Sequence, residues 1–227
     1  MARRASTRTS ATRPRPRGGL PDKRRAILAG AHTVFSRDGF TRASIDAIAA
    51  EAAVSTRTIY NHFSDKGELF FEVIKESSDH VAEAQIAVIE RHLYKVTDLE
   101  ADLTALGRAW LEPDPEQATH FVLTQHIAAD AAHIPDEIIT AWQEAGPVRV
   151  RRALATHMRD LMDRGLLRDG DEARAAYQFL LLIQATNPST ASVGTPSDDE
   201  RTEAVAAGVQ TFLYGHAGPR HRRRRRR

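Results

Sequence analysis

The stretch FTRASIDAIAAEAAVSTRTIYNHFSDK, residues 40–66, decides the fold of this chain. It predicts two short helices joined by a tight turn. Ser44 is a favourable N-cap, and the apolar residues after it recur at the three- and four-residue spacing of one buried helical face. The chain then turns at Ala53 and Val54, and Ser55 can cap the second helix.

The second of these helices has a thin apolar seam, because only Ile59 and Phe63 suit a core. A helix this short is poorly stable alone, so we expect its open face to meet a partner. That face offers hydroxyls, one guanidinium, an amide and an imidazole, which are groups that bond phosphates and base edges. The pattern therefore favours a helix that reads DNA.

Charge is distributed unevenly along the chain. Residues 1–25 carry nine Lys/Arg and one Asp, whereas residues 67–219 carry 12 Lys/Arg and 25 Asp/Glu. The last eight residues include seven arginines. A basic N-terminal end and tail beside an acidic body favour a polyanionic partner for one end of the molecule. Solvated tails that contact nothing are the alternative, and the C-terminal tail could also lie against the acidic body.

Several classes of protein are disfavoured by composition. The 227 residues contain no cysteine, which excludes disulfides and thiolate metal sites. No stretch approaches the roughly 18 apolar residues of a membrane span, and the Arg-rich N-terminus lacks the apolar core of a secretory signal. We therefore expect a cytoplasmic protein that does not contact a membrane.

Catalytic signatures are also missing. The motifs GxSxG, GxGxxG, HExxH and the P-loop do not occur. The best alternative is a metal site formed by His126, Asp130 and His133 on one helical face. Solvated or mutually bonded side chains are favoured instead, because Pro135 follows so closely that His133 can lie off the helix. We expect no enzyme, no cofactor and no metal.

The periodicity of the remaining chain is helical throughout, and no alternating strand pattern occurs. A first helix is predicted from about Asp22 to Asp38, with Gly39 as its stop. The fold class is all-α, with an N-terminal three-helix helix-turn-helix domain and a C-terminal helical bundle. The predicted divisions are a disordered basic arm (1–20), the helix-turn-helix domain (21–66), a ligand-binding and dimerisation domain (67–215) and an Arg-rich tail (216–227), with a mobile loop from Thr186 to Pro196.

The helix-turn-helix stretch resembles the TetR/AcrR family of bacterial transcriptional regulators. The residues that match the family signature are Gly39, Phe40, Thr41, Ile48, Ala49, Ala53, Val54, Ser55, Thr58, Tyr60, His62, Phe63, Lys66 and Leu69. The resemblance covers roughly the first third of the chain. The run from Glu144 to Leu167 resembles one subgroup of the family's C-terminal domains.

The resemblance implies roles for single residues. Thr41, Tyr60, His62 and Lys66 would bind phosphates. Thr56, Arg57 and Asn61 would lie nearest base edges, since Arg suits guanine and Asn suits adenine. A packed core ring is the alternative for Tyr60, and a plain surface imidazole for His62. The full predicted DNA-binding set is Thr41, Arg42, Ser44, Ser55, Thr56, Arg57, Thr58, Tyr60, Asn61, His62 and Lys66.

Further residues are implied in the C-terminal domain, whose helices usually enclose an effector cavity in this family. The predicted lining residues are Trp110, Phe121, Gln125, Trp142, Met158, Met162 and Phe179. One recognition helix makes few base contacts, so two are needed about 34–36 Å apart on successive major grooves, which predicts a two-fold homodimer. Its predicted interface is Tyr177, Leu181, Leu182, Val205, Val209 and Phe212, although residues 179–183 also suit a central core helix.

These inferences favour a dimeric repressor that a small apolar ligand of unknown identity releases from a palindromic operator in double-stranded DNA. A regulator without a small effector, controlled by a protein partner or by its abundance, is the alternative. An activator stays open, because DNA binding would look the same. An enzyme that keeps the helix-turn-helix only as a scaffold has no residue in its favour.

Overall fold

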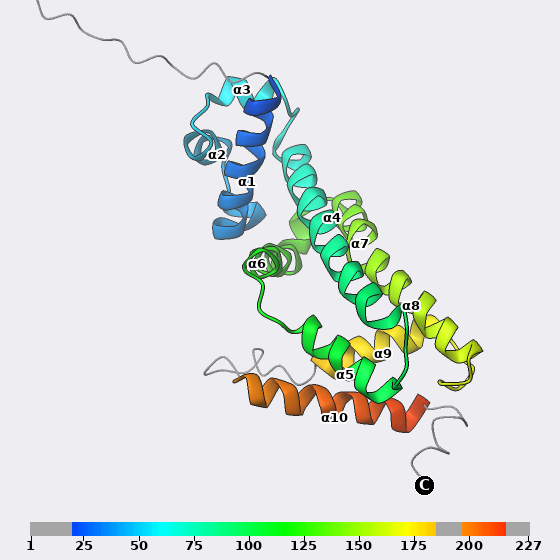
Figure 1. Cartoon of the computed structure of the whole chain (residues 1–227). Helices are drawn as coiled ribbons and strands as arrows, with labels where there is room; N and C mark the ends of the chain where they lie inside the picture. Colours follow the sequence, from blue (N-terminus) through cyan, green and yellow to red (C-terminus); the bar gives the residue numbers. More distant parts are fainter. Residues whose placement is uncertain (1–19, 185–196, 217–227) are drawn as a thin grey trace, which may run out of the picture.

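The computed structural model describes residues 20–184 and 197–216, and this part of the chain consists of helices and short connections without a β-strand (Figure 1). The all-α prediction is confirmed. The predicted loop from Thr186 to Pro196 lies outside the described residues, as do the predicted arm and tail apart from Leu20 and His216. Of the helices within the described ranges, none is long and apolar enough to cross a membrane.

Three helices form the N-terminal module, namely α1 (Leu20–Arg42), α2 (Ile45–Glu51) and α3 (Thr56–Tyr60). The 28-residue helix α4 (Lys66–Leu93) leads from the module into a helical bundle, which we call the body (Figure 1). The body continues with α5 (Leu99–Trp110), α6 (Pro115–Asp130), the 3₁₀ turn η1 (Ala131–His133), α7 (Asp136–Ala145), α8 (Pro147–Asp163), α9 (Glu172–Gln184) and α10 (Asp198–His216).

Helices α2 and α3 begin after the predicted N-caps, whereas α1 begins at Leu20, two residues before the predicted Asp22. The Ser44 hydroxyl accepts a hydrogen bond from the Ala47 N–H, and the Ser55 hydroxyl accepts one from the Thr58 N–H, both at 3.1 Å. Gly39 has a φ of 74°, which residues with a Cβ adopt only at a cost, so the regular part of α1 ends there. These local signals set the directions in which α2 and α3 leave α1.

Gly30 of α1 packs closely against Ala52, the C-cap of α2. A Cβ placed on this glycine would lie 2.9 Å from both the Cβ and the backbone nitrogen of Ala52. No side chain fits between two backbones at that distance. The absence of a side chain at residue 30 therefore permits the packing of α2 on α1.

Two hydrophobic clusters support the fold. The first lies beneath the module and combines residues of α1–α4 with Leu123, Ile127, Ile134 and Ile138 from the body. The second fills the far end of the body, where α4, α5, α8, α9 and α10 meet. Hydrophobic packing crosses the predicted division at residue 66.

Candidate DNA-binding face and effector cavity

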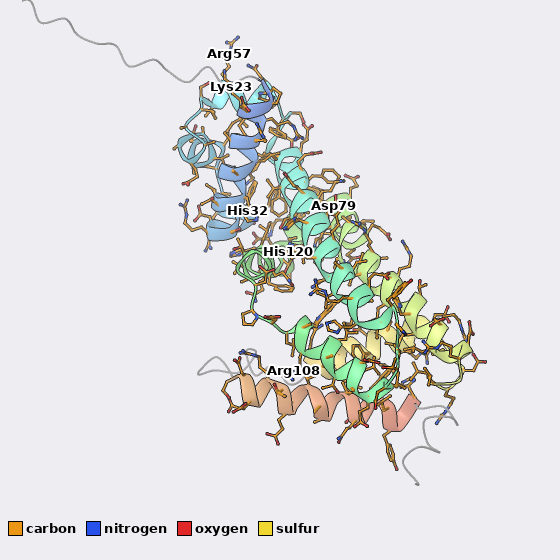
Figure 2. All side chains as sticks on the ribbon, in the orientation of Figure 1. Lys23, His32, Arg57, Asp79, Arg108 and His120 are labelled. Atoms are coloured by element: carbon orange, nitrogen blue, oxygen red, sulfur yellow. The ribbon has the colours of Figure 1, made fainter. Side chains whose placement is uncertain are left out.

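Helix α3 presents the open face that its sequence predicted. Ile59 is fully buried and Phe63 almost so, whereas the Tyr60 ring is 56% exposed and is therefore not a packed core ring. Arg57 lies at the outer end of the module and points away from the rest of the protein (Figure 2). A guanidinium and a phenol on an open helix face are groups that can bond the base edges and phosphates of DNA.

Most other members of the predicted DNA-binding set bond to neighbouring residues of the module or are exposed. The hydroxyls of Ser55 and Thr58 lie 2.8 Å apart, and Asn61 is the C-cap of α3. Arg42 is exposed, and its Nε donates to the Asp38 carbonyl at 3.0 Å. Thr41, Ser44 and Asn61 are exposed, and Thr56, Thr58 and His62 are half-buried.

Lys66 holds two elements together. Its ammonium donates to the carbonyls of Phe40, Ala43 and Thr41 at 2.9, 3.1 and 3.5 Å, and lies 4.6 Å from the centre of the Phe40 ring. These contacts employ all three N–H groups of a lysine. Lys66 therefore ties the first turn of α4 to the end of α1, and its predicted contact with phosphate stays a prediction.

Helix α6 of the body contacts α1 of the module through two polar side chains. His126 Nε2 lies 3.1 Å from the Ser36 carbonyl, to which it donates, and the Asp130 carboxylate accepts from the Thr41 N–H at 3.0 Å. That bond is the largest cause that lowers the pKa of the Asp130 carboxyl below its ordinary value. The two residues therefore hold the C-terminal end of α1 against α6, beside the predicted phosphate ligand Thr41.

The alternative metal site is not formed in the described part of the chain. His126 and Asp130 are bonded to α1, while His133 lies in η1 and is exposed. The described residues contain no group of three or more His, Asp or Glu placed to hold a metal ion.

A partly open cavity of about 580 Å³ is bordered by α4, α5, α6, α8 and α9 and by the end of α7. Its size is in the range of small-molecule sites. Four of the predicted lining residues do line it, namely Trp110, Phe121, Gln125 and Trp142. Met158, Met162 and Phe179 do not, because their side chains are buried in the second hydrophobic cluster instead.

Sequence reasoning missed several residues on the wall of this cavity, including Ser78, His120 and Arg151. His120 is 5% exposed and bonded to the Ser77 hydroxyl at 2.9 Å, and burial lowers its pKa to about 4. The signal for Ser78 was its spacing, because it falls four residues after Ile74 on the apolar stripe of α4. A polar residue on a buried stripe indicates a polar partner.

The predicted dimer surface divides into exposed and buried residues. Tyr177 and Leu181, four residues apart on α9, are 49% and 48% exposed. Leu182 is partly buried, and Val205, Val209 and Phe212 are buried in the protomer's own second cluster. The three α10 residues face inward because α10 packs on α9 and α5, so the exposed face of α9 is the part of the prediction that a partner could meet.

An exposed short helix after a tight turn, backed by a three-helix module and joined to a hollow helical body, defines a helix-turn-helix transcriptional regulator. The profile of the family described as "Bacterial regulatory proteins, tetR family" matches residues 27–73, and that of the "AefR-like transcriptional repressor, C-terminal domain" matches residues 101–216. The chain belongs to the TetR family of DNA-binding transcriptional regulators, which are not enzymes.

Individual proteins agree with this assignment. The HTH-type transcriptional activator FasR of Mycolicibacterium smegmatis is 32% identical over 226 residues, which cover 95% of each chain. The structure of a TetR-family regulator from Mesorhizobium loti superposes with a TM-score of 0.75 at 27% identity, covering 87% of this chain and 98% of the other. The Flavonoid-responsive Regulator FrrA gives a TM-score of 0.66 at 26% identity, covering 88% and 99%.

Proposed function

We propose that this protein is a homodimeric regulator that binds a palindromic operator and releases it when a small molecule enters the cavity of the body. The observation that carries the proposal is the double role of α6. Phe121, Thr124 and Gln125 on this helix line the cavity, and His126 and Asp130 hold α1. Any ligand that displaces α6 therefore acts on the module through bonded contacts.

The dimer follows from the size of the recognition helix. Helix α3 has five residues, so a single copy reaches few base edges, and sequence-specific binding needs two copies on successive major grooves. The exposed apolar face of α9 around Tyr177 and Leu181 supports a contact between two copies. We assign Arg57, Thr56 and Asn61 to base readout, and Tyr60, His62 and Thr41 to phosphates.

Release would require that the ligand prefer the arrangement of the body that misplaces the two modules. A ligand shifts such an equilibrium only by its difference in affinity for the two states, typically about 1–3 kcal/mol. The structural neighbour FrrA is named a flavonoid-responsive regulator, which supports a small-molecule effector here. The alternative, control by a protein partner or by abundance, is less favoured because the body contains a cavity.

The direction of regulation has support on both sides. The matching C-terminal family is described as a transcriptional repressor, whereas FasR is named an activator. We propose a repressor in the cytoplasm. A reporter gene fused to a promoter that contains the operator distinguishes repression from activation. Deletion of the regulator raises expression from a repressed promoter and lowers expression from an activated one.

The test of the proposed function is the selection of bound fragments from a random DNA pool at physiological salt. We expect a palindromic site, occupied by two protomers and lost on Tyr60→Ala. Recovery of no shared sequence would contradict the proposal and leave the basic tails as the main ligands of DNA, with a linear dependence of log affinity on log salt.

A further inference from the structure

Two residues that line the cavity each carry a buried polar atom that has no hydrogen-bond partner among the described residues. These atoms are Ser78 Oγ on α4 and Trp142 Nε1 on α7. Nearly all buried polar groups in folded proteins are hydrogen-bonded. A buried polar group without a partner in the protein therefore points to a bound ion, water or ligand. A third such atom, Ser36 Oγ on α1, does not line this cavity.

The surroundings of Ser78 suit a bonding site. Ser78 is only 1% exposed. Gly146, at the end of α7, packs directly on it, since a Cβ placed on Gly146 would lie 3.3 Å from Ser78 Cβ and 3.7 Å from Ser78 Oγ. Ser78 lines the cavity, and the close approach of the chain at Gly146 helps to shield its hydroxyl from bulk water.

The chemistry of the two atoms restricts what they can bind. An indole N–H only donates, and a hydroxyl both donates and accepts. An oxygen with two lone pairs, such as that of a carbonyl or a carboxylate, accepts from donors of this kind. The polar end of the ligand therefore carries an acceptor oxygen rather than a donor alone.

The other residues that line the cavity favour a flat ligand without positive charge. The rings of Trp110, Phe121 and Tyr177 line the cavity together with Trp142. No Asp or Glu is among its described lining residues, and Arg151 is their sole Lys or Arg, 6.0 Å above the Tyr177 ring. His120 is neutral near pH 7, because burial lowers its pKa to about 4.

We propose that the cavity binds a flat, apolar molecule with a carbonyl or carboxylate oxygen and no positive charge, and that this oxygen accepts hydrogen bonds from Trp142 Nε1 and the Ser78 hydroxyl. The proposal rests on the proposed function, because it names the class of effector. It differs from the proposed function in what it predicts for the protein without DNA.

The test uses four probes that share a naphthalene ring system. Each is titrated calorimetrically into the full-length protein without DNA. They are 2-acetylnaphthalene, its isosteric alkene 2-isopropenylnaphthalene, 2-naphthoate and the cation 1-(2-naphthyl)ethylammonium. We expect the ketone to bind roughly tenfold more tightly than the alkene, because the alkene leaves the buried N–H and O–H unpaired. We expect the carboxylate to bind and the ammonium to bind least.

Three variants locate the effect. Trp142→Phe keeps a ring but removes the N–H, and Ser78→Ala removes the hydroxyl. Each should lower the ketone-to-alkene preference toward one. Trp110→Phe is the matched control, because Trp110 lines the same cavity but its Nε1 is not a buried unpaired atom, and it should keep the preference. If Trp142→Phe does not fold, Ser78→Ala gives the same comparison.

Equal affinity for ketone and alkene, tightest binding of the ammonium, or failure of all four probes to bind at millimolar concentration would overturn the proposal. So would a preference that survives both Trp142→Phe and Ser78→Ala, since bound water would then satisfy the two atoms. Operator release is measured separately. Selective binding of the ketone without operator release supports the proposed site but counts against the ligand-responsive function. Operator release by ketone and alkene alike supports the ligand-responsive function but counts against the proposed site.

Discussion

The N-terminal module and the body arrange their polar side chains over different distances. In the module, Ser44 and Ser55 bond to backbone N–H groups three residues further on. In the body, the wall of the cavity joins Ser78, His120 and Trp142, which lie on three different helices. The local arrangement depends only on residues close together in the chain. A long-range arrangement can change when one helix moves, which is what an effector site requires.

The most direct way to break the module is to separate α1 from α2. Gly30→Val should cost about 3 kcal/mol or more, because its side chain has no space beside Ala52. Chemical unfolding and operator binding measure the effect. Gly170→Ala is the control, since nothing lies within 4 Å of a Cβ at that position, and it should leave both unchanged. A stable Gly30→Val protein with normal operator affinity would contradict the close packing.

Recognition by the module separates into two measurable parts. Arg57→Ala should cost about 2 kcal/mol at one base pair and relax the preference there, because a guanidinium reads a base edge. Tyr60→Phe should weaken binding to all sequences alike, since it removes the hydroxyl that we propose contacts a phosphate. Binding curves on operators with single substitutions distinguish them. An unchanged preference in Arg57→Ala would remove this residue from base readout.

Low pH should destabilise the folded protein by protonating His120. Its folded pKa of about 4 lies below the ordinary 6.5, so the unfolded chain binds the proton more readily. The stabilisation is complete above about pH 6.5 and is lost as pH falls toward 4. Between pH 7 and 5 the free energy of unfolding should fall by roughly 1–2 kcal/mol from this group.

Urea unfolding at both pH values measures the loss, and His120→Gln should show a smaller one. His32 also has a lowered pKa, caused chiefly by burial, so part of the dependence should remain in that variant. An identical pH dependence in His120→Gln and the unchanged protein would show that His120 is already protonated or solvated in the folded state.

The smallest expected effect concerns the connection between the two regions. Asp130→Ala removes the carboxylate that accepts from the Thr41 N–H, and should reduce the coupling between effector and operator by about 1 kcal/mol. Operator affinity measured with and without a bound probe gives the coupling. Thr33→Ala, on the exposed side of α1, is the control and should leave the coupling intact.

The module could be predicted almost residue by residue because its signals are local. Ser44, Gly39 and Ser55 act within a few residues of themselves, so their order in the chain is enough. The cavity could be predicted only in part. Trp110 and Trp142 stood out as large side chains, but spacing alone gave no means of separating Phe121, which lines the cavity, from Phe179, which does not.

Contacts between distant segments could not be predicted. His126 and Asp130 were visible as a pair on one helical face, but their partners on α1 are 90 and 89 residues away. Lys66 was expected at a phosphate, and its three carbonyl partners follow from the return of the chain past the end of α1. The burial of Val205 and Phe212 depends on which face α10 turns toward α9.

The hydrophobic cluster beneath the module has a consequence for protein engineering. The body contributes four residues to that cluster, namely Leu123, Ile127, Ile134 and Ile138. The N-terminal module therefore cannot be exchanged as an independent unit that ends at residue 66. A hybrid regulator made by grafting another family member's first three helices onto this body would inherit a mismatched seam of four apolar side chains. Exchange of operator specificity is better attempted on the open face of α3, where substitutions leave the shared core intact.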